Sequence, residues 1–184
     1  NAGVMAATNE AVAAAQFPML LWVFGAVAAL CLLTFRSFAA TLCILLPLGL
    51  ASLLAYALMA WLEIGLKVGT LPVVALGVGI GVDYGIYICS RFAALRRPGR
   101  SLRETYEDAL AITGNGVLFT GLTLGLAVAT WVLSSLKFQA DMGILLVFLF
   151  VMNMIGAIVL LPALAHFLVG EPKPGKDPEP KPAR

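Results

Sequence analysis

Five apolar stretches, each long enough to cross a lipid bilayer as a helix, constrain this sequence more than any other feature. They cover about 17–35, 38–62, 71–89, 109–133 and 142–168. A spanning helix needs about 20 apolar residues to cross about 30 Å of hydrocarbon. Of the 184 residues, 61% are hydrophobic and only 12% are charged, against about 25% charged in a soluble domain. The sequence therefore predicts an all-α integral membrane protein, built as a bundle of five transmembrane helices.

The two ends of the chain differ in composition from the spans. Residues 1–16 are rich in alanine and are expected to be a helical lead-in or the end of a missing periplasmic domain. Residues 17–168 form the expected five-helix domain. From 169 to 184, proline alternates with charged residues, which cannot build a core, so a disordered tail is expected. The sequence begins with Asn1 rather than Met, which suggests a fragment of a longer chain.

Helix starts are indicated at two places. Thr70 is a candidate N-cap for the third span, with Pro72 in the first turn, where its missing N–H costs nothing. A basic loop is expected over 91–103. At the end of this loop, Ser101 and Glu104 have the spacing of a capping box, which predicts an interfacial helix leading into the fourth span.

The distribution of basic residues predicts the orientation. With five spans, the first and third connections and the C-terminal tail share one side of the membrane. That side holds ten basic residues: Arg36, Arg91, Arg96, Arg97, Arg100, Arg103, Lys173, Lys176, Lys181 and Arg184. The other side holds Lys67 and Lys137. The positive-inside rule then predicts a cytoplasmic C-terminus, with Trp61 and Trp131 near the outer interface.

Asp83 is the acidic residue that lies deepest within a span. No Lys or Arg lies in the same stretch to neutralise it, and a carboxylate at mid-bilayer costs about 3 kcal/mol on insertion scales. Hydrocarbon favours the protonated form of a carboxyl group, which suits a proton carrier that works near neutral pH. The alternative is a structural acid paired with a group elsewhere in the protein.

Hydroxyl groups near Asp83 are candidates for a proton relay. Tyr87 is four residues on and shares the face of Asp83, and Tyr84 lies about 100° around the helix. Thr113 and Thr120 share one side of the fourth span and are expected to hydrogen-bond Asp83 or to line a proton path. The alternatives are aromatic packing for the tyrosines, and hydrogen bonds to their own helix for the threonines.

Small and polar residues also predict helix packing. Gly77, Gly81 and Gly85 recur every four residues, and Gly79 precedes Asp83 by four. Such glycines let another helix approach closely. Asn153 is a candidate to join two helices by a hydrogen bond.

Other polar residues are assigned no chemistry. Asp141 and Lys137, near the outer end, are expected to be solvated. The three cysteines lie in apolar runs without a CxxC pair, and His166 is the only histidine, so no disulfide framework, metal site or cofactor is expected. The glycine run lacks the Lys-Ser/Thr of a phosphate-binding loop, and the arginine loop lacks interleaved aromatics. We therefore expect neither an enzyme nor a nucleic-acid-binding protein.

Two motifs together resemble the RND (resistance-nodulation-division) superfamily, and most closely its MMPL-type and hopanoid-exporter-like branch. The first is the Gly-rich Asp-Tyr stretch Gly-Val-Gly-Ile-Gly-Val-Asp-Tyr-Gly-Ile-Tyr over 77–87. The second, over 118–164, includes Phe-Thr-Gly-Leu-Thr, Ser-Ser-Leu-Lys-Phe-Gln-Ala-Asp-Met-Gly and Leu-Leu-Pro-Ala-Leu. The resemblance covers about 17–168.

The resemblance implies a fold and a function. The chain would be one half, without its first helix, of an RND-type transmembrane domain in the bacterial inner membrane. It would be the transmembrane part of a proton-motive-force-driven exporter of hydrophobic or lipid-like substrates, with Asp83 as the proton site and the proton as the coupling ion. Its partners would be membrane lipids, the other half of the transporter with its periplasmic domains, and further copies of itself in a homo-oligomer. The alternatives are a sterol-sensing-type lipid sensor and a protein-translocation accessory subunit.

Overall fold

The computed structural model describes residues 2–65, 70–96 and 101–169, and all regular structure in them is helical. The helices are α1 (Ala2–Phe35), α2 (Phe38–Trp61), α3 (Leu71–Leu95), α4 (Leu102–Ala129), the 3-10 turn η1 (Thr130–Leu133), α5 (Lys137–Ile155), the π-helical turn η2 (Gly156–Leu160) and α6 (Leu161–Val169). Five of the resulting helical segments are long and apolar enough to cross a membrane. The predicted all-α bundle is therefore confirmed.

Several helices extend beyond the expected boundaries. Residues 2–16 are helical and continuous with the first span. The third helix runs to Leu95, so Arg91 lies on a helix. The boundary expected from sequence, which puts this residue in the basic loop, is wrong. The residues over 91–95 (Arg-Phe-Ala-Ala-Leu) include no Gly or Pro that would break the helix. The backbone hydrogen bonds of α3 therefore continue to the water interface.

The helix starts follow the expectations in part. The Ser101 side-chain oxygen accepts a hydrogen bond from the Glu104 backbone N–H at 3.2 Å, so the predicted cap is confirmed. No separate interfacial helix precedes the fourth span, because α4 is continuous from Leu102. Thr70 is at the N-cap position of α3, as predicted, but its backbone is already helical (φ −87°, ψ −18°) and its side chain makes no capping hydrogen bond.

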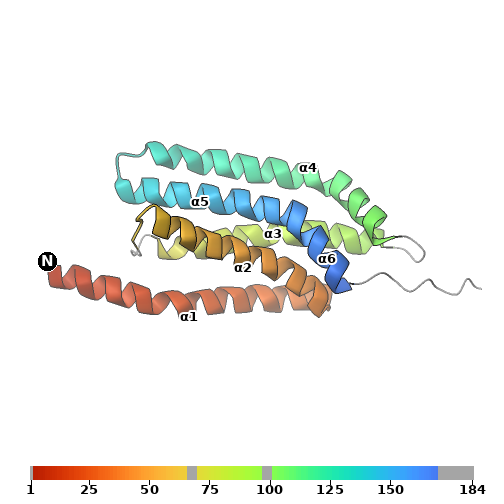
Figure 1. Ribbon diagram of the computed structural model, residues 1–184, viewed down its shortest axis with the longest axis horizontal. Helices are drawn as coiled ribbons and strands as arrows, with labels where there is room; N and C mark the ends of the chain where they lie inside the picture. The colour runs from red at the N-terminus through yellow and green to blue at the C-terminus, as the bar shows by residue number, and fades with distance from the viewer. Residues whose placement is uncertain (1, 66–69, 97–100, 170–184) are drawn as a thin grey trace, which may run out of the picture.

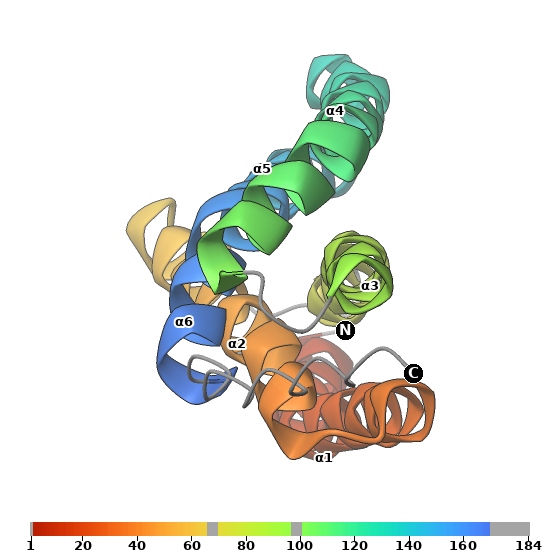
Figure 2. The same ribbon diagram turned by 90° about the vertical axis from the view of Figure 1, so that its right-hand side faces the viewer.

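The helices form an arc around α3. In the end-on view, α4, α5, α2 and α1 follow one another along a curved wall, and α3 lies on its concave side (Figure 2). The side view shows the same order, with α3 between α1 and α4 (Figure 1). The third helix contacts all four helices of the wall. The face of α3 that points away from the wall is not covered by any described residue.

Two apolar clusters fill the concave side of the wall. Ile44, Val78 and Ile88 belong to the cluster toward the α1–α2 connection. Val73 and Leu145 belong to the one toward the opposite end. Both clusters include residues of α3, so this helix is the centre of the core.

The described basic residues separate between the two ends of the bundle. Arg36, Arg91, Arg96 and Arg103 lie at the end where α1 turns into α2 and α3 ends, and Lys137 lies at the other end, where α5 begins (Figure 1). We refer to the first of these as the arginine end. Trp61 and Trp131 lie at the end with Lys137. The up-and-down order of the helices therefore produces the charge separation on which the predicted orientation rests.

Candidate functional site

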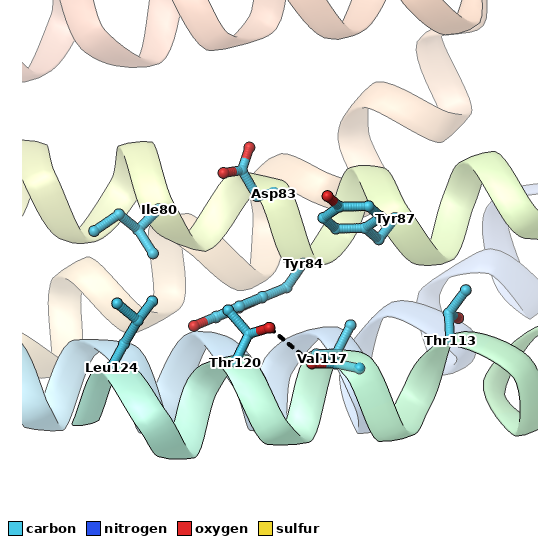
Figure 3. Close-up of a pocket in the computed structure, with 9 residues that line it drawn as sticks. Ile80, Asp83, Tyr84, Tyr87, Thr113, Val117, Thr120 and Leu124 are labelled. Atoms are coloured by element: carbon cyan, nitrogen blue, oxygen red, sulfur yellow. Dashed lines mark hydrogen bonds between the residues drawn. The ribbon is translucent and has the colours of Figure 1, made fainter. Parts of the chain in front are cut away.

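A groove of about 540 Å³ runs between α3 and α4, and we call it the Asp83 groove. It is lined by Ile80, Asp83, Tyr84, Tyr87, Thr113, Gly116, Val117, Thr120 and Leu124. All five residues proposed from sequence as a proton relay are among them (Figure 3). The apolar wall formed by Ile80, Val117 and Leu124 was not foreseen, because apolar residues in an apolar span carry no distinguishing signal.

Asp83 lies on the uncovered face of α3. Its carboxyl group points away from α4 (Figure 3). The positions one helical turn before and after share this face: Gly79 has open space where a side chain would stand, and Tyr87 is 65% exposed. The spacing of four residues thus builds an open stripe along α3, with the acid at its middle.

None of the described basic side chains lines the Asp83 groove, and these residues lie at or near helix ends. Within this part of the chain, no cation therefore holds the Asp83 carboxylate in its charged state. A carboxyl group in such a place can exchange its proton when its surroundings change from wet to dry.

Tyr84 joins the open stripe to the fourth helix. Its side chain is 2% exposed and reaches across toward Thr120 (Figure 3). Its hydroxyl oxygen is buried and has no hydrogen-bond partner among the described residues. A buried hydroxyl without a partner is unusual, and here it provides a free donor and acceptor inside the groove.

The two threonines bond to their own helix. The Thr113 hydroxyl donates to the Ala109 carbonyl at 2.6 Å, and the Thr120 hydroxyl donates to the Gly116 carbonyl at 2.8 Å. The expectation that they hydrogen-bond Asp83 is therefore wrong for this structure, and the alternative interpretation holds. Because the donor of each hydroxyl is used, each oxygen faces the groove as an acceptor only.

The opposite face of α3 is closely packed. A Cβ atom on Gly77 would lie 2.6 Å from Leu149 Cδ1, and one on Gly85 would lie 3.0 Å from Ile44 Cγ2. A Cβ atom on Gly81 would overlap the Asn153 side chain. These three glycines thus allow α2 and α5 to approach α3. Gly79 does not, since a Cβ there would meet nothing within 4 Å, and its assignment to helix packing is wrong within the described residues.

Asn153 joins α5 to α3, as the sequence predicted. Its Nδ2 donates to the Gly77 carbonyl at 2.8 Å, between residues 76 positions apart in the chain. The side chain is 3% exposed, and its Oδ1 has no partner among the described residues. The fifth span changes to the π-helical turn η2 three residues later, where Gly156 passes Pro47 of α2.

The expectation for Asp141 is wrong. This residue is buried, with 9% exposure, while Lys137 is exposed as expected. The reason is the register of α5: Asp141 is one turn before Leu145 and two before Leu149, and both leucines are fully buried. The sequence alone did not show this, because Leu145 and Leu149 look no different from the other apolar residues of the span.

Known proteins resemble this chain in part. It is 32% identical over 120 residues to membrane protein MJ1562 of Methanocaldococcus jannaschii, a match that covers 65% of the chain and 31% of the relative. It is 34% identical over 101 residues to membrane protein SCO6666 of Streptomyces coelicolor, a match that covers 55% of the chain and 14% of the relative. The chain thus spans less than a third of each relative. The model of the MMPL family matches residues 1–181, nearly the whole sequence. The chain belongs to the MMPL family.

Proposed function

We propose that this chain is the transmembrane part of a proton-motive-force-driven exporter of hydrophobic or lipid-like substrates, with Asp83 as the proton-carrying site. The observation that carries the proposal is the Asp83 groove. Among the residues that the structure describes, it combines an acid at mid-span and a buried tyrosine hydroxyl without a partner, and it is lined by no basic side chain. Membership of the MMPL family supports a transporter rather than an enzyme.

The energetic argument rests on changes of protonation state. A permanently charged acid at mid-membrane is costly, and a permanently neutral one carries nothing. Only a group that gains and loses a proton as its exposure changes can couple a proton gradient to helix movement. Asp83 is suited to this because its face of α3 is open in the five-helix block and can be wetted or covered by other parts of the full-length protein.

The position of Tyr84 supports a relay in which the hydroxyl acts with the acid. The phenol is next to Asp83 in sequence and extends toward α4, so it can hydrogen-bond water that enters the groove. Thr113 and Thr120 contribute acceptor oxygens along the same wall. Tyr87 lies nearer the arginine end of the stripe, where a proton would enter or leave on the cytoplasmic side of the proposed orientation.

The test is Asp83→Asn in the full-length protein. This change keeps the volume of the side chain and removes its titration. We expect normal insertion but loss of export, measured as complementation of a deletion strain at matched membrane levels. Glu63→Gln, which changes an exposed acid between α2 and α3, is the control and should retain wild-type export. Wild-type export by Asp83→Asn would refute the proton-site assignment and favour a lipid sensor or a scaffold.

The proposed orientation in the bacterial inner membrane is tested separately. Single cysteines at Gly99 and Ser135 are introduced into a background without Cys31, Cys43 and Cys89. A membrane-impermeant thiol reagent applied to intact spheroplasts should label position 135 and leave position 99 unlabelled. The reverse pattern would place the arginine end outside and would invert the direction of proton entry.

A further inference from the structure

A second groove, of about 450 Å³, lies between the start of α4 and α6, apart from the Asp83 groove. Its polar lining residues are Arg103, Glu107 and His166, and its apolar walls include Leu102, Leu110 and Pro162. None of these residues takes part in the proposed proton relay. We call this cavity the α4–α6 groove.

The deepest residues that line the α4–α6 groove are apolar. The fourth helix runs inward from the arginine end, so Leu110 is about two turns deeper than Leu102. The last helix runs outward, so Pro162 is about one turn deeper than His166. Leu102 lies at the outermost turn, beside Arg103, but the deepest lining residues, Leu110 and Pro162, are both apolar. The charged groups therefore lie nearer the arginine end than this apolar floor, as an amphiphile standing upright in one leaflet requires.

The rim carries both signs of charge. Arg103 Nε lies 2.8 Å from Glu107 Oε1, and the two side chains are 88% and 61% exposed. An exposed ion pair of this kind contributes little to the free energy of folding. Either side chain can therefore leave the pair and bind a ligand with little loss of stability. The guanidinium group favours phosphate, which it binds through two N–H groups, and the carboxylate favours an ammonium group.

We propose that the α4–α6 groove binds one zwitterionic aminophospholipid, with its phosphate at Arg103, its ammonium group at Glu107 and an acyl chain along Leu110 and Pro162. A lipid with a purely anionic head group would be repelled by the Glu107 carboxylate. A choline head group has no N–H to donate and would need an aromatic cage. Tyr106, the aromatic residue of the groove, is 7% exposed and stacks on Phe92 with ring centroids 4.2 Å apart, so its ring is not free to form one.

The test uses the full-length protein in nanodiscs that contain equal amounts of phosphatidylethanolamine, phosphatidylcholine and phosphatidylglycerol. Native mass spectrometry of the released protein reports which lipids are retained. Wild type should retain phosphatidylethanolamine preferentially. Glu107→Gln should lower the ratio of retained phosphatidylethanolamine to phosphatidylglycerol by about threefold to fivefold, the scale of an exposed charge contact.

Glu104→Gln is the matched control, because it makes the same chemical change at an exposed residue on the same helical turn that does not line the groove. It should leave the ratio unchanged. An equal shift in both variants, or none in Glu107→Gln, would overturn the proposal. A photoactivatable phosphatidylethanolamine gives a second measurement: crosslinks within 102–110 and 162–166 support the site, and crosslinks found only elsewhere refute it. Neither result depends on proton coupling at Asp83.

Discussion

The two faces of α3 are made from the same kinds of residue and serve opposite purposes. On one face, side chains of α2 and α5 pack directly against the glycines at 77, 81 and 85. A methyl group at any of these positions would require the neighbouring side chains to shift. On the other, Gly79 is followed by Asp83 and Tyr87 along an open stripe. Glycine therefore does not mark a packed face by itself, and the partner helix decides whether the space is filled.

The packed face fixes the position of the open one. Asn153 ties α5 to the backbone of α3 at Gly77, and the glycine contacts set the rotation of α3 about its own axis. Because successive residues are about 100° apart on a helix, this rotation turns Asp83 away from the wall. Changes on the packed face should therefore affect stability, and changes on the open face should affect transport.

The largest expected effect is that of Gly81→Leu. A side chain at this position meets Asn153 and Leu48, so we expect a loss of about 3 kcal/mol or more and failure to assemble. Thermal stability and yield of the full-length protein in detergent measure this. Ile86→Leu, on the same helix, keeps the side-chain volume and should be mild. Unchanged stability of Gly81→Leu would show that this face is not packed.

A double-mutant cycle tests the contact between Gly81 and Asn153. Asn153→Ala should cost about 1.5 kcal/mol, since it removes the bond to the Gly77 carbonyl and leaves a small cavity. Gly81→Ala should cost less in the Asn153→Ala background than in wild type, by about 1 kcal/mol, because the amide that it overlaps is gone. Additive effects in thermal unfolding would contradict a direct contact between these two positions.

Tyr84→Phe removes the hydroxyl group and keeps the aromatic ring, so it tests the role of the hydroxyl alone. The ring is buried and should keep its place, so insertion and stability should remain close to wild type. Export should fall by about fivefold, the scale of one hydrogen bond, and less than in Asp83→Asn. An export defect as large as that of Asp83→Asn would give the phenol an essential role, and wild-type export would remove it from the relay.

Gly79→Ala should have the smallest effect and the opposite sign. The added methyl group meets nothing within 4 Å, and alanine is favoured over glycine within a helix by about 0.5–1 kcal/mol. A slight rise in the melting temperature is expected, in contrast to the fall with Gly81→Ala. A clear loss of stability in the full-length protein would show that another part of that protein packs on the open stripe.

Part of the candidate site could be predicted from sequence. Asp83 is conspicuous as an acid in an apolar span, and helical spacing alone places Tyr87 on its face. The preference of Thr113 and Thr120 for their own carbonyls could not be decided, because a threonine hydroxyl has the same sequence context in either arrangement. The sequence also could not show that the Tyr84 hydroxyl has no partner among the described residues, because this depends on which side chains of α4 lie opposite it.

The sequence by itself determined the number of spans, the all-α class, the separation of basic residues between the two ends, and the family. These follow from length, hydropathy and motif, which need no knowledge of neighbours. The tertiary structure alone decided which side of each helix faces the core, and so the open position of Asp83 and the burial of Asp141. The physical reason is that membrane helices are apolar all round: lipid is as apolar as the bundle interior, so hydrophobic periodicity does not distinguish a buried face from a lipid-exposed one.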